Sequence, residues 1–218
     1  MQKNHERYLH RTASFIGGFA AMYTVMIRMN LGSSQTVNLL DLTHALLGRD
    51  IRQLLLRIIG VIIYGSSVFS ATYLTKKGKV NTRLISAVLS ITAFIIAGFL
   101  PAETDHCIAL YPFFLSMSFM WVVYGNACEY ASAPIFSTNN FRQTIGGIAE
   151  YLADHDKKAL DKSKFYAGTL AVFTTGSIIS YFTCIEFMEK AIFFGVIPCI
   201  ALLAYELVPS VVSAKSKS

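Results

Sequence analysis

Long apolar segments fill most of this chain and restrict what it can fold into. They cover residues 14–31, 35–47, 54–75, 84–100, 107–130, 134–152, 165–185 and 191–208. A helix needs about 20 mainly apolar residues to cross the hydrocarbon core of a bilayer, and several segments approach or exceed that length. Only 15% of the residues are charged, against about 25% in a typical soluble domain. We therefore expect an all-α integral membrane protein. The lack of strict polar–apolar alternation argues against an outer-membrane barrel.

Two of these segments, 35–47 and 134–152, are too polar to cross as lipid-facing helices. Their polar residues are Gln35, Asn38, Asp41 and His44 in the first, and Asn139, Asn140, Arg142, Gln143 and Glu150 in the second. A charged side chain at the bilayer centre costs about 2.5 to 3.5 kcal/mol on insertion scales. We therefore expect six transmembrane helices, and we expect these two segments to form short or re-entrant helices.

The loop charges favour the same topology. If the N-terminus is cytoplasmic and the two mixed segments do not cross, the lysine clusters all fall inside and the acidic loop 103–105 falls outside. The clusters are Lys76, Lys77 and Lys79 with Arg83, then Lys157, Lys158, Lys162 and Lys164, then Lys215 and Lys217. This distribution obeys the positive-inside rule, whereas eight crossings would place the first cluster outside. The sequence thus predicts cytoplasmic tails at 1–12 and 210–218. No small-residue cleavage site follows the basic N-terminus, so we expect an uncleaved first helix.

Two matching polar segments interrupt the apolar pattern. We call residues 33–40 the first notch and residues 136–143 the second notch. Both contain T-x-N, at Thr36 and Asn38 and, 102 residues later, at Thr138 and Asn140. Each notch leads into a short helix, a polar break and a long apolar segment. The sequence therefore indicates one membrane domain, 1–218, built of repeat 1 (13–101) and repeat 2 (107–209). With three spans in each repeat, the second is inverted, as in many secondary transporters. Chance similarity of two polar breaks is the alternative.

The notches are the best candidates for a binding site. Irregular backbone at membrane depth is satisfied by protein or by water in a cavity, and Ser, Thr and Asn cap helix N-termini. Two half-helices that begin near the midplane would direct the positive ends of their dipoles at one place, which favours an anion or a strongly polar solute. The candidate solute ligands are Gln35, Thr36, Asn38, Asn126, Thr138, Asn139, Asn140 and Arg142. Helix capping alone is the competing interpretation.

Three titratable residues near the notches are candidates for proton coupling. Asp41 and His44 are three residues apart on one helix face and could form a proton relay. They could equally cap and solvate a helix near the outer surface. Glu129 follows Asn126 by three residues, and we expect both on one face of the apolar helix 107–130.

Two arginines each allow two interpretations. Arg142 lies just inside the second notch, where its planar donor fork suits an anion or pairs with Glu129 or Glu150. Arg28 lies late in the first span, and we expect it to snorkel to the outer interface. Contact with a solute is the alternative.

These residues resemble a known family. The stretch 18–23 reads G-F-A-A-M-Y, 125–127 reads G-N-A, and the two T-x-N motifs follow, the second with Arg142 behind it. In order and spacing the chain is similar to the YoaK family of bacterial inner-membrane proteins, whose function is largely unassigned. The resemblance covers about residues 14–181 and implies a six-helix protein of the bacterial inner membrane. Ala21 stands where that family usually has Asp, and Val37 and Asn139 replace the two glycines of its T-G-N motifs.

Other classes of function lack the residues they need. The sequence has no nucleophile–base pair, no H-E-x-x-H and no Gly-rich phosphate loop, so we expect neither an enzyme nor a cofactor. Its four cysteines and five histidines form no metal-ligand spacing. The net charge of +6 follows from the positive-inside rule and does not indicate nucleic acid. We therefore predict a small secondary transporter or permease whose partners are the lipid bilayer, a small polar or anionic solute and, in a homo-oligomer, further copies of itself. The alternative is a membrane scaffold or sensor that transports nothing and whose notches are helix caps.

Overall fold

The computed structural model describes residues 2–207, and these are almost entirely helical. The helices are α1 (Gln2–Arg28), α2 (Gln35–Leu47), α3 (Ile51–Lys77), α4 (Thr82–Phe99), α5 (His106–Ala109), α6 (Tyr111–Tyr124), α7 (Thr138–Asp154), α8 (Lys157–Phe187) and α9 (Ile192–Leu207), with a 3-10 turn at Met188–Ala191. Strands β1 (Asn126–Ala127) and β2 (Tyr130–Ala131) form an antiparallel hairpin between α6 and α7. The C-terminal tail expected at 210–218 lies outside the described residues.

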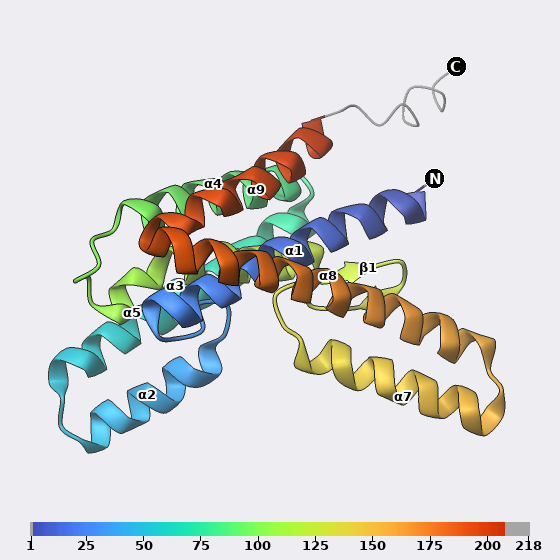
Figure 1. Cartoon of the computed structure of the whole chain (residues 1–218), viewed down its shortest axis with the longest axis horizontal. Helices are drawn as coiled ribbons and strands as arrows, with labels where there is room; N and C mark the ends of the chain where they lie inside the picture. The colour runs from blue at the N-terminus through green and yellow to red at the C-terminus, as the bar shows by residue number, and fades with distance from the viewer. Residues whose placement is uncertain (1, 208–218) are drawn as a thin grey trace.

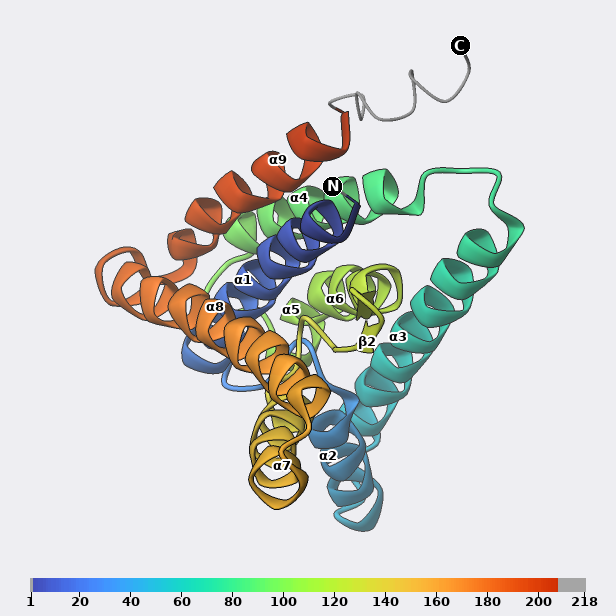
Figure 2. The same cartoon turned by 90° about the vertical axis from the view of Figure 1, so that its right-hand side faces the viewer.

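The long helices run along the long axis of the molecule (Figure 1). Seen from its end, α1 and α6 lie in the middle, α3 and α8 lie to either side of them, and α4 and α9 close one side (Figure 2). Helix α8 packs on α1, α3 packs on α6, and α4 packs on both α6 and α9. The short helices α2 and α7 both lie on the opposite side from α4 and α9 but extend toward opposite ends, and each is packed on the helix that follows it (Figures 1 and 2).

Four helical segments among the described residues are long and apolar enough to cross a membrane. They are Ile51–Lys77, Thr82–Phe99, His106–Tyr124 and Lys157–Leu207, and the last comprises α8, the 3-10 turn and α9. Large apolar side chains such as Ile62, Phe69 and Phe182 are exposed on these helices, as a lipid environment requires. The chain is therefore a multi-pass helical membrane protein.

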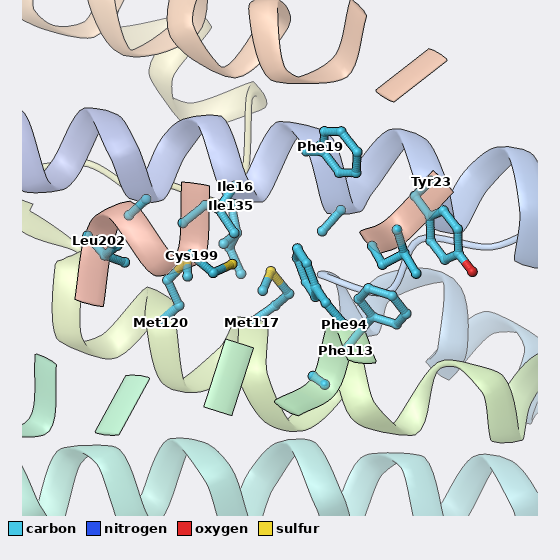
Figure 3. Packing of buried hydrophobic residues seen from close by; sticks show 14 of the residues in the cluster. Ile16, Phe19, Tyr23, Phe94, Phe113, Met117, Met120, Ile135, Cys199 and Leu202 are labelled. Atoms are coloured by element: carbon cyan, nitrogen blue, oxygen red, sulfur yellow. The ribbon is translucent and has the colours of Figure 1, made fainter. Parts of the chain in front are cut away.

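The main core lies where α1, α4, α6 and α9 meet. Its buried side chains include Phe19, Phe94, Phe113, Met117 and Cys199, which face one another across the helices (Figure 3). Helices in lipid gain little free energy by burying apolar surface against one another, so close van der Waals packing contributes more to their association. This packing holds the two central helices in place. The first notch follows α1 after a short loop, and the second follows α6 after the β1–β2 hairpin.

Glycines let α1 and α8 approach closely. A Cβ atom added to Gly18 would overlap the backbone carbonyl oxygen of Phe173, and one added to Gly176 would overlap that of Phe15. The hydroxyl of Ser177 also donates a hydrogen bond to the Gly18 carbonyl oxygen, at 3.0 Å. Small residues at a membrane helix contact allow this kind of backbone approach.

Three sequence expectations need correction. Helix α1 extends back to Gln2, so the expected N-terminal tail is helical over almost all its length. Helix α6 ends at Tyr124 and not at Tyr130, because residues 126–131 turn back as the hairpin. Arg28 does not snorkel: it is buried and donates to the carbonyl oxygens of Ala97, Leu100 and Pro101 at 3.2 to 3.4 Å. The Ala97 carbonyl lies in the last turn of α4, and those of Leu100 and Pro101 lie just beyond the helix end. The buried cation therefore bonds carbonyls at the negative end of the α4 dipole.

Candidate functional site

The two notches begin two short helices that run in opposite directions. Helix α2 starts near the middle of the long axis and runs to one end of the molecule, while α7 starts near the middle and runs to the other end (Figure 1). Both lie on the same side of the bundle in both views (Figures 1 and 2). The free N–H groups and the positive dipole ends of α2 and α7 therefore both lie toward the middle of the molecule.

In the first notch, Asn38 is buried and its amide is fully bonded. Its Nδ2 donates to Oε1 of Gln35 (2.8 Å) and to the backbone carbonyl oxygen of Arg57 (3.3 Å). Its Oδ1 accepts from Nη1 of Arg57, at 3.4 Å. The same Arg57 nitrogen forms an ion pair with Oδ2 of Asp41, at 2.9 Å. Asn38 thus fixes the first turn of α2 against α3 through a charged partner.

The start of α2 also carries polar atoms without partners. The hydroxyl of Ser34 accepts a hydrogen bond from the backbone N–H of Thr36 and caps the helix. The Oγ of Ser33 and the Nε2 of Gln35 are buried and form no hydrogen bond within the described residues. Buried polar groups are nearly always bonded, so each of these two atoms can still bond a water or a polar solute.

In the second notch, Asn140 is equally buried and equally bonded. Its Nδ2 donates to the carbonyl oxygens of Ala133 and Phe136, both at 2.9 Å. Its Oδ1 accepts from the hydroxyl of Ser132, at 2.9 Å, and Ser132 in turn contacts Nε2 of His10 on α1, at 3.1 Å. Both T-x-N asparagines therefore have a structural role. Asn38 bonds Arg57 directly, and Asn140 is linked to His10 through Ser132.

The remaining notch candidates are available to a ligand. Thr36, Thr138, Asn139 and Arg142 are exposed, and their side chains form no hydrogen bond or ion pair within residues 2–207. They lie in the first two turns of α2 and α7. Asn126 is also exposed, but it lies in strand β1 and outside either notch.

The three proton-coupling candidates are not brought together. Asp41 pairs with Arg57 and accepts from Nδ2 of Asn30 at 3.0 Å, whereas His44 is exposed on α2. Glu129 is exposed at the turn of the hairpin and pairs with Lys3, at 3.1 Å. The expectation that Asn126 and Glu129 share a helix face is wrong, because the hairpin replaces the helix there.

Neither acidic residue expected beside Arg142 pairs with it. Glu129 bonds Lys3, and Glu150 approaches Lys162 on α8 at 4.0 Å. The guanidinium therefore remains the exposed cation nearest the start of α7 along the chain.

Beside the first notch lies a cavity of about 340 Å³, comparable to the lower range of small-molecule sites. Its lining comprises Gln53, Arg57, Ala102, Glu103, Thr104, Asp105 and His106. Asp105 is held by Nε2 of Gln53 at 2.9 Å and by Arg52 at 3.5 Å. Arg57 reaches from this cavity to Asn38, so the cavity and the first notch share one cation.

Sequence reasoning missed the two residues that hold the notch asparagines. Arg57 is the one charged residue in the apolar segment 54–75, and that isolation was a usable signal, since a lone intramembrane charge is usually functional. His10 carried no such signal, because it falls in a stretch that reads as a polar tail.

Comparison with known families gives one match. The model of a family described as "Protein of unknown function (DUF1275)" matches residues 9–205. No curated protein and no solved structure gave a significant match.

Proposed function

The chain belongs to the family described as protein of unknown function (DUF1275), and we propose that it is a small permease for a small polar or anionic solute. The observation that carries this proposal is the arrangement of α2 and α7, two short helices whose N-terminal ends lie toward the middle of the molecule on one side of the bundle. Paired half-helix N-termini at the membrane midplane are how many secondary transporters bind anionic groups.

The proposed topology has six crossings in two inverted units. The packing supports this, because exchanging α1 with α6, α2 with α7, α3 with α8 and α4 with α9 maps the helix contacts onto one another. The α1–α8 contact becomes α6–α3, α2–α3 becomes α7–α8, α4–α6 becomes α9–α1, and α4–α9 maps onto itself. An inverted pair of repeats related by a two-fold axis would have this property.

The proposal includes a place in the cell. The resemblance of residues 18–23 and of the T-x-N motifs to the YoaK family supports a bacterial inner membrane. By the positive-inside rule, the lysine clusters favour a cytoplasmic location for the start of α1 and for the α3–α4 connection. The start of α1, this connection and the end of α9 lie at the same end of the molecule (Figure 1).

In this proposal the solute contacts the exposed notch residues and not the buried amides. Thr36, Thr138 and Asn139 offer hydroxyl and amide donors beside the two helix N-termini, and Arg142 adds a charge. Asn38 and Asn140 hold the first turns of α2 and α7, since their own hydrogen-bonding capacity is already used. Gln35 contributes an Nε2 that still lacks an acceptor.

Uptake by proteoliposomes tests the proposal. The purified protein is reconstituted and offered isotopically labelled phosphate, sulfate, nitrate, formate and glycerol. We expect uptake of one of them above that of empty vesicles, with the rate lowered about tenfold in Arg142→Gln, which is what a lost charge-assisted hydrogen bond of about 1.5 kcal/mol implies. Uptake of none of these by a correctly folded protein would contradict the proposal.

The complete bonding of Asn38 and Asn140 favours a second candidate, a membrane scaffold or sensor whose notches are helix caps. In that case Asn38→Ala and Asn140→Ala lower the stability, and no solute stabilises the wild type. The permease predicts instead that the transported solute raises the melting temperature of the wild type, as any ligand that binds only the native state does. Thermal unfolding with and without each solute therefore separates the two candidates.

A further inference from the structure

We propose that His10 is a proton-binding site, and that its protonation controls how firmly the second notch is held. The inference deepens the proposed function by naming the proton as coupling ion and His10 as its carrier. The binding of the proton itself requires no solute, so it can be measured separately.

The hydrogen bonds around Asn140 fix the direction of each donor. Its Nδ2 faces two backbone carbonyl oxygens, of Ala133 and Phe136, which only accept. The amide nitrogen must therefore lie on that side, and Oδ1 must face Ser132. Because Oδ1 only accepts, the single hydroxyl proton of Ser132 is donated to Asn140.

The same logic then assigns both protons on His10. The Oγ of Ser132 has no further proton, so Nε2 of His10, 3.1 Å away, must donate to it. Nδ1 of His10 lies 2.8 Å from the backbone carbonyl oxygen of Tyr124, which can only accept, so Nδ1 also donates. A histidine that donates from both nitrogens is an imidazolium. The network around the second notch is complete only when His10 is protonated.

Loss of the proton forces a rearrangement. With Nδ1 still donating to Tyr124, Nε2 becomes an acceptor, and the hydroxyl of Ser132 turns to donate to it. Oδ1 of Asn140 then loses its donor in a buried position, which buried polar groups rarely tolerate. The first turn of α7 is thereby released from α1, and this motion links the proton to the start of the half-helix.

The surroundings on α1, α6 and α8 act on the charge of the ring in opposite directions, and burial, which disfavours the imidazolium, has the largest effect. Glu6, one turn earlier on α1, accepts a hydrogen bond from the backbone N–H of Cys128. Tyr124 supplies the last carbonyl of α6, so the negative end of that helix dipole favours the imidazolium. Burial and the adjacent Arg11 disfavour it. From α8, Phe165 stacks on the ring at 5.5 Å between centroids, and Tyr166 is neutral at ordinary pH.

The hairpin and α7 add little charge near the ring. Glu129 is exposed and paired with Lys3, Glu150 is exposed and paired with Lys162, and Arg142 is exposed. The ring can therefore change its charge without a fixed ion pair opposing the change.

The two notches differ in what this network can do. Asn38 accepts a hydrogen bond from Arg57, which stays charged at every physiological pH. Asn140 is tied instead to a histidine, the side chain that titrates in that range. The bond that holds the first notch is thus present at every physiological pH, whereas the network that holds the second notch is complete only while His10 is protonated.

Two measurements on the full-length protein in lipid nanodiscs test the inference. Nitrogen-15 NMR of labelled histidines reports the protonation of each ring nitrogen between about pH 5 and pH 9, with His10→Gln identifying the signal of His10. A spin label attached at Ile145→Cys, an exposed position on α7, reports the motion of that helix. The native cysteines are buried, which directs labelling to the new thiol.

We expect His10 to show two protonated nitrogens in its acid form, and the label to change mobility at the same midpoint. His10→Gln should abolish the pH response of the label, whereas the exposed control His44→Gln should keep it. Ser132→Ala removes the acceptor of the Nε2 proton, so it should lower the His10 midpoint by about one pH unit.

The inference is overturned if the ring stays neutral across this range, or if the label still responds to pH in His10→Gln. Should His10→Gln fail to fold, an unchanged His10 midpoint in Ser132→Ala overturns it equally. A protein that shows the expected titration and label response but takes up no solute contradicts the permease and leaves the proton site standing.

Discussion

Arg57 supplies the positive charge that holds the first notch together. It bonds Asp41 at 2.9 Å and Asn38 at 3.4 Å, and its side chain is only 13% exposed. Arg57→Met would leave Asp41 without its cation and Oδ1 of Asn38 without a donor. We expect a loss of about 2 kcal/mol of stability, because breaking one side of a largely buried pair costs more than the pair contributes. This corresponds to a melting temperature about 4 to 8 °C lower.

A double-mutant cycle with Asp41→Asn checks this account of Arg57. The loss in Arg57→Met/Asp41→Asn should be smaller than the sum of the two single losses, since the second change removes the charge that the first left unpaired. Simple addition of the two losses would show that the pair is not coupled.

At the scale of elements, the contact between α1 and α8 depends on glycine. Gly18→Ala would place a Cβ against the backbone carbonyl of Phe173, and no side-chain rotation relieves that overlap. We expect the α1–α8 contact to open, with a clear fall in melting temperature and in the yield of folded protein.

Gly65→Ala is the matched control for Gly18→Ala. It lies within α3, and an added Cβ there meets nothing within 4 Å. It should leave stability unchanged or raise it by about 0.5 to 1 kcal/mol, since alanine favours a helix over glycine. Equal losses in both variants would contradict the account of the α1–α8 contact.

The sequence anticipated some elements better than others for physical reasons. The start of α2 at Gln35 was predictable because Ser34 is a local capping signal. The hairpin was not, because Cys128 and Glu129 adopt positive φ angles of 53° and 75° without a glycine to announce a turn. Arg57, which bonds Asn38, lies on α3, and His10, which reaches Asn140 through Ser132, lies on α1. No local pattern in a single sequence encodes such contacts between helices.

At the scale of the whole molecule, the proposed topology places the α3–α4 connection and the α4–α5 connection on opposite sides of the membrane. In intact cells, a membrane-impermeant thiol reagent should therefore label Glu103→Cys and not Lys79→Cys. Both positions are exposed, so accessibility within the protein does not bias the comparison. Labelling of both positions, or of neither, would contradict an odd number of crossings between them.

The central claim is that a solute binds where α2 and α7 begin, and uptake by a matched pair of double variants tests it most directly. Thr36→Val/Thr138→Val removes the exposed hydroxyl of each T-x-N motif, while Thr43→Val/Thr175→Val removes two exposed hydroxyls that bond only to their own helices. For the solute that the wild type takes up, we predict a rate about 30-fold lower in the notch variant, as two lost hydrogen bonds of about 1 kcal/mol each imply, and an unchanged rate in the control. Equal rates in the two variants would contradict the claim.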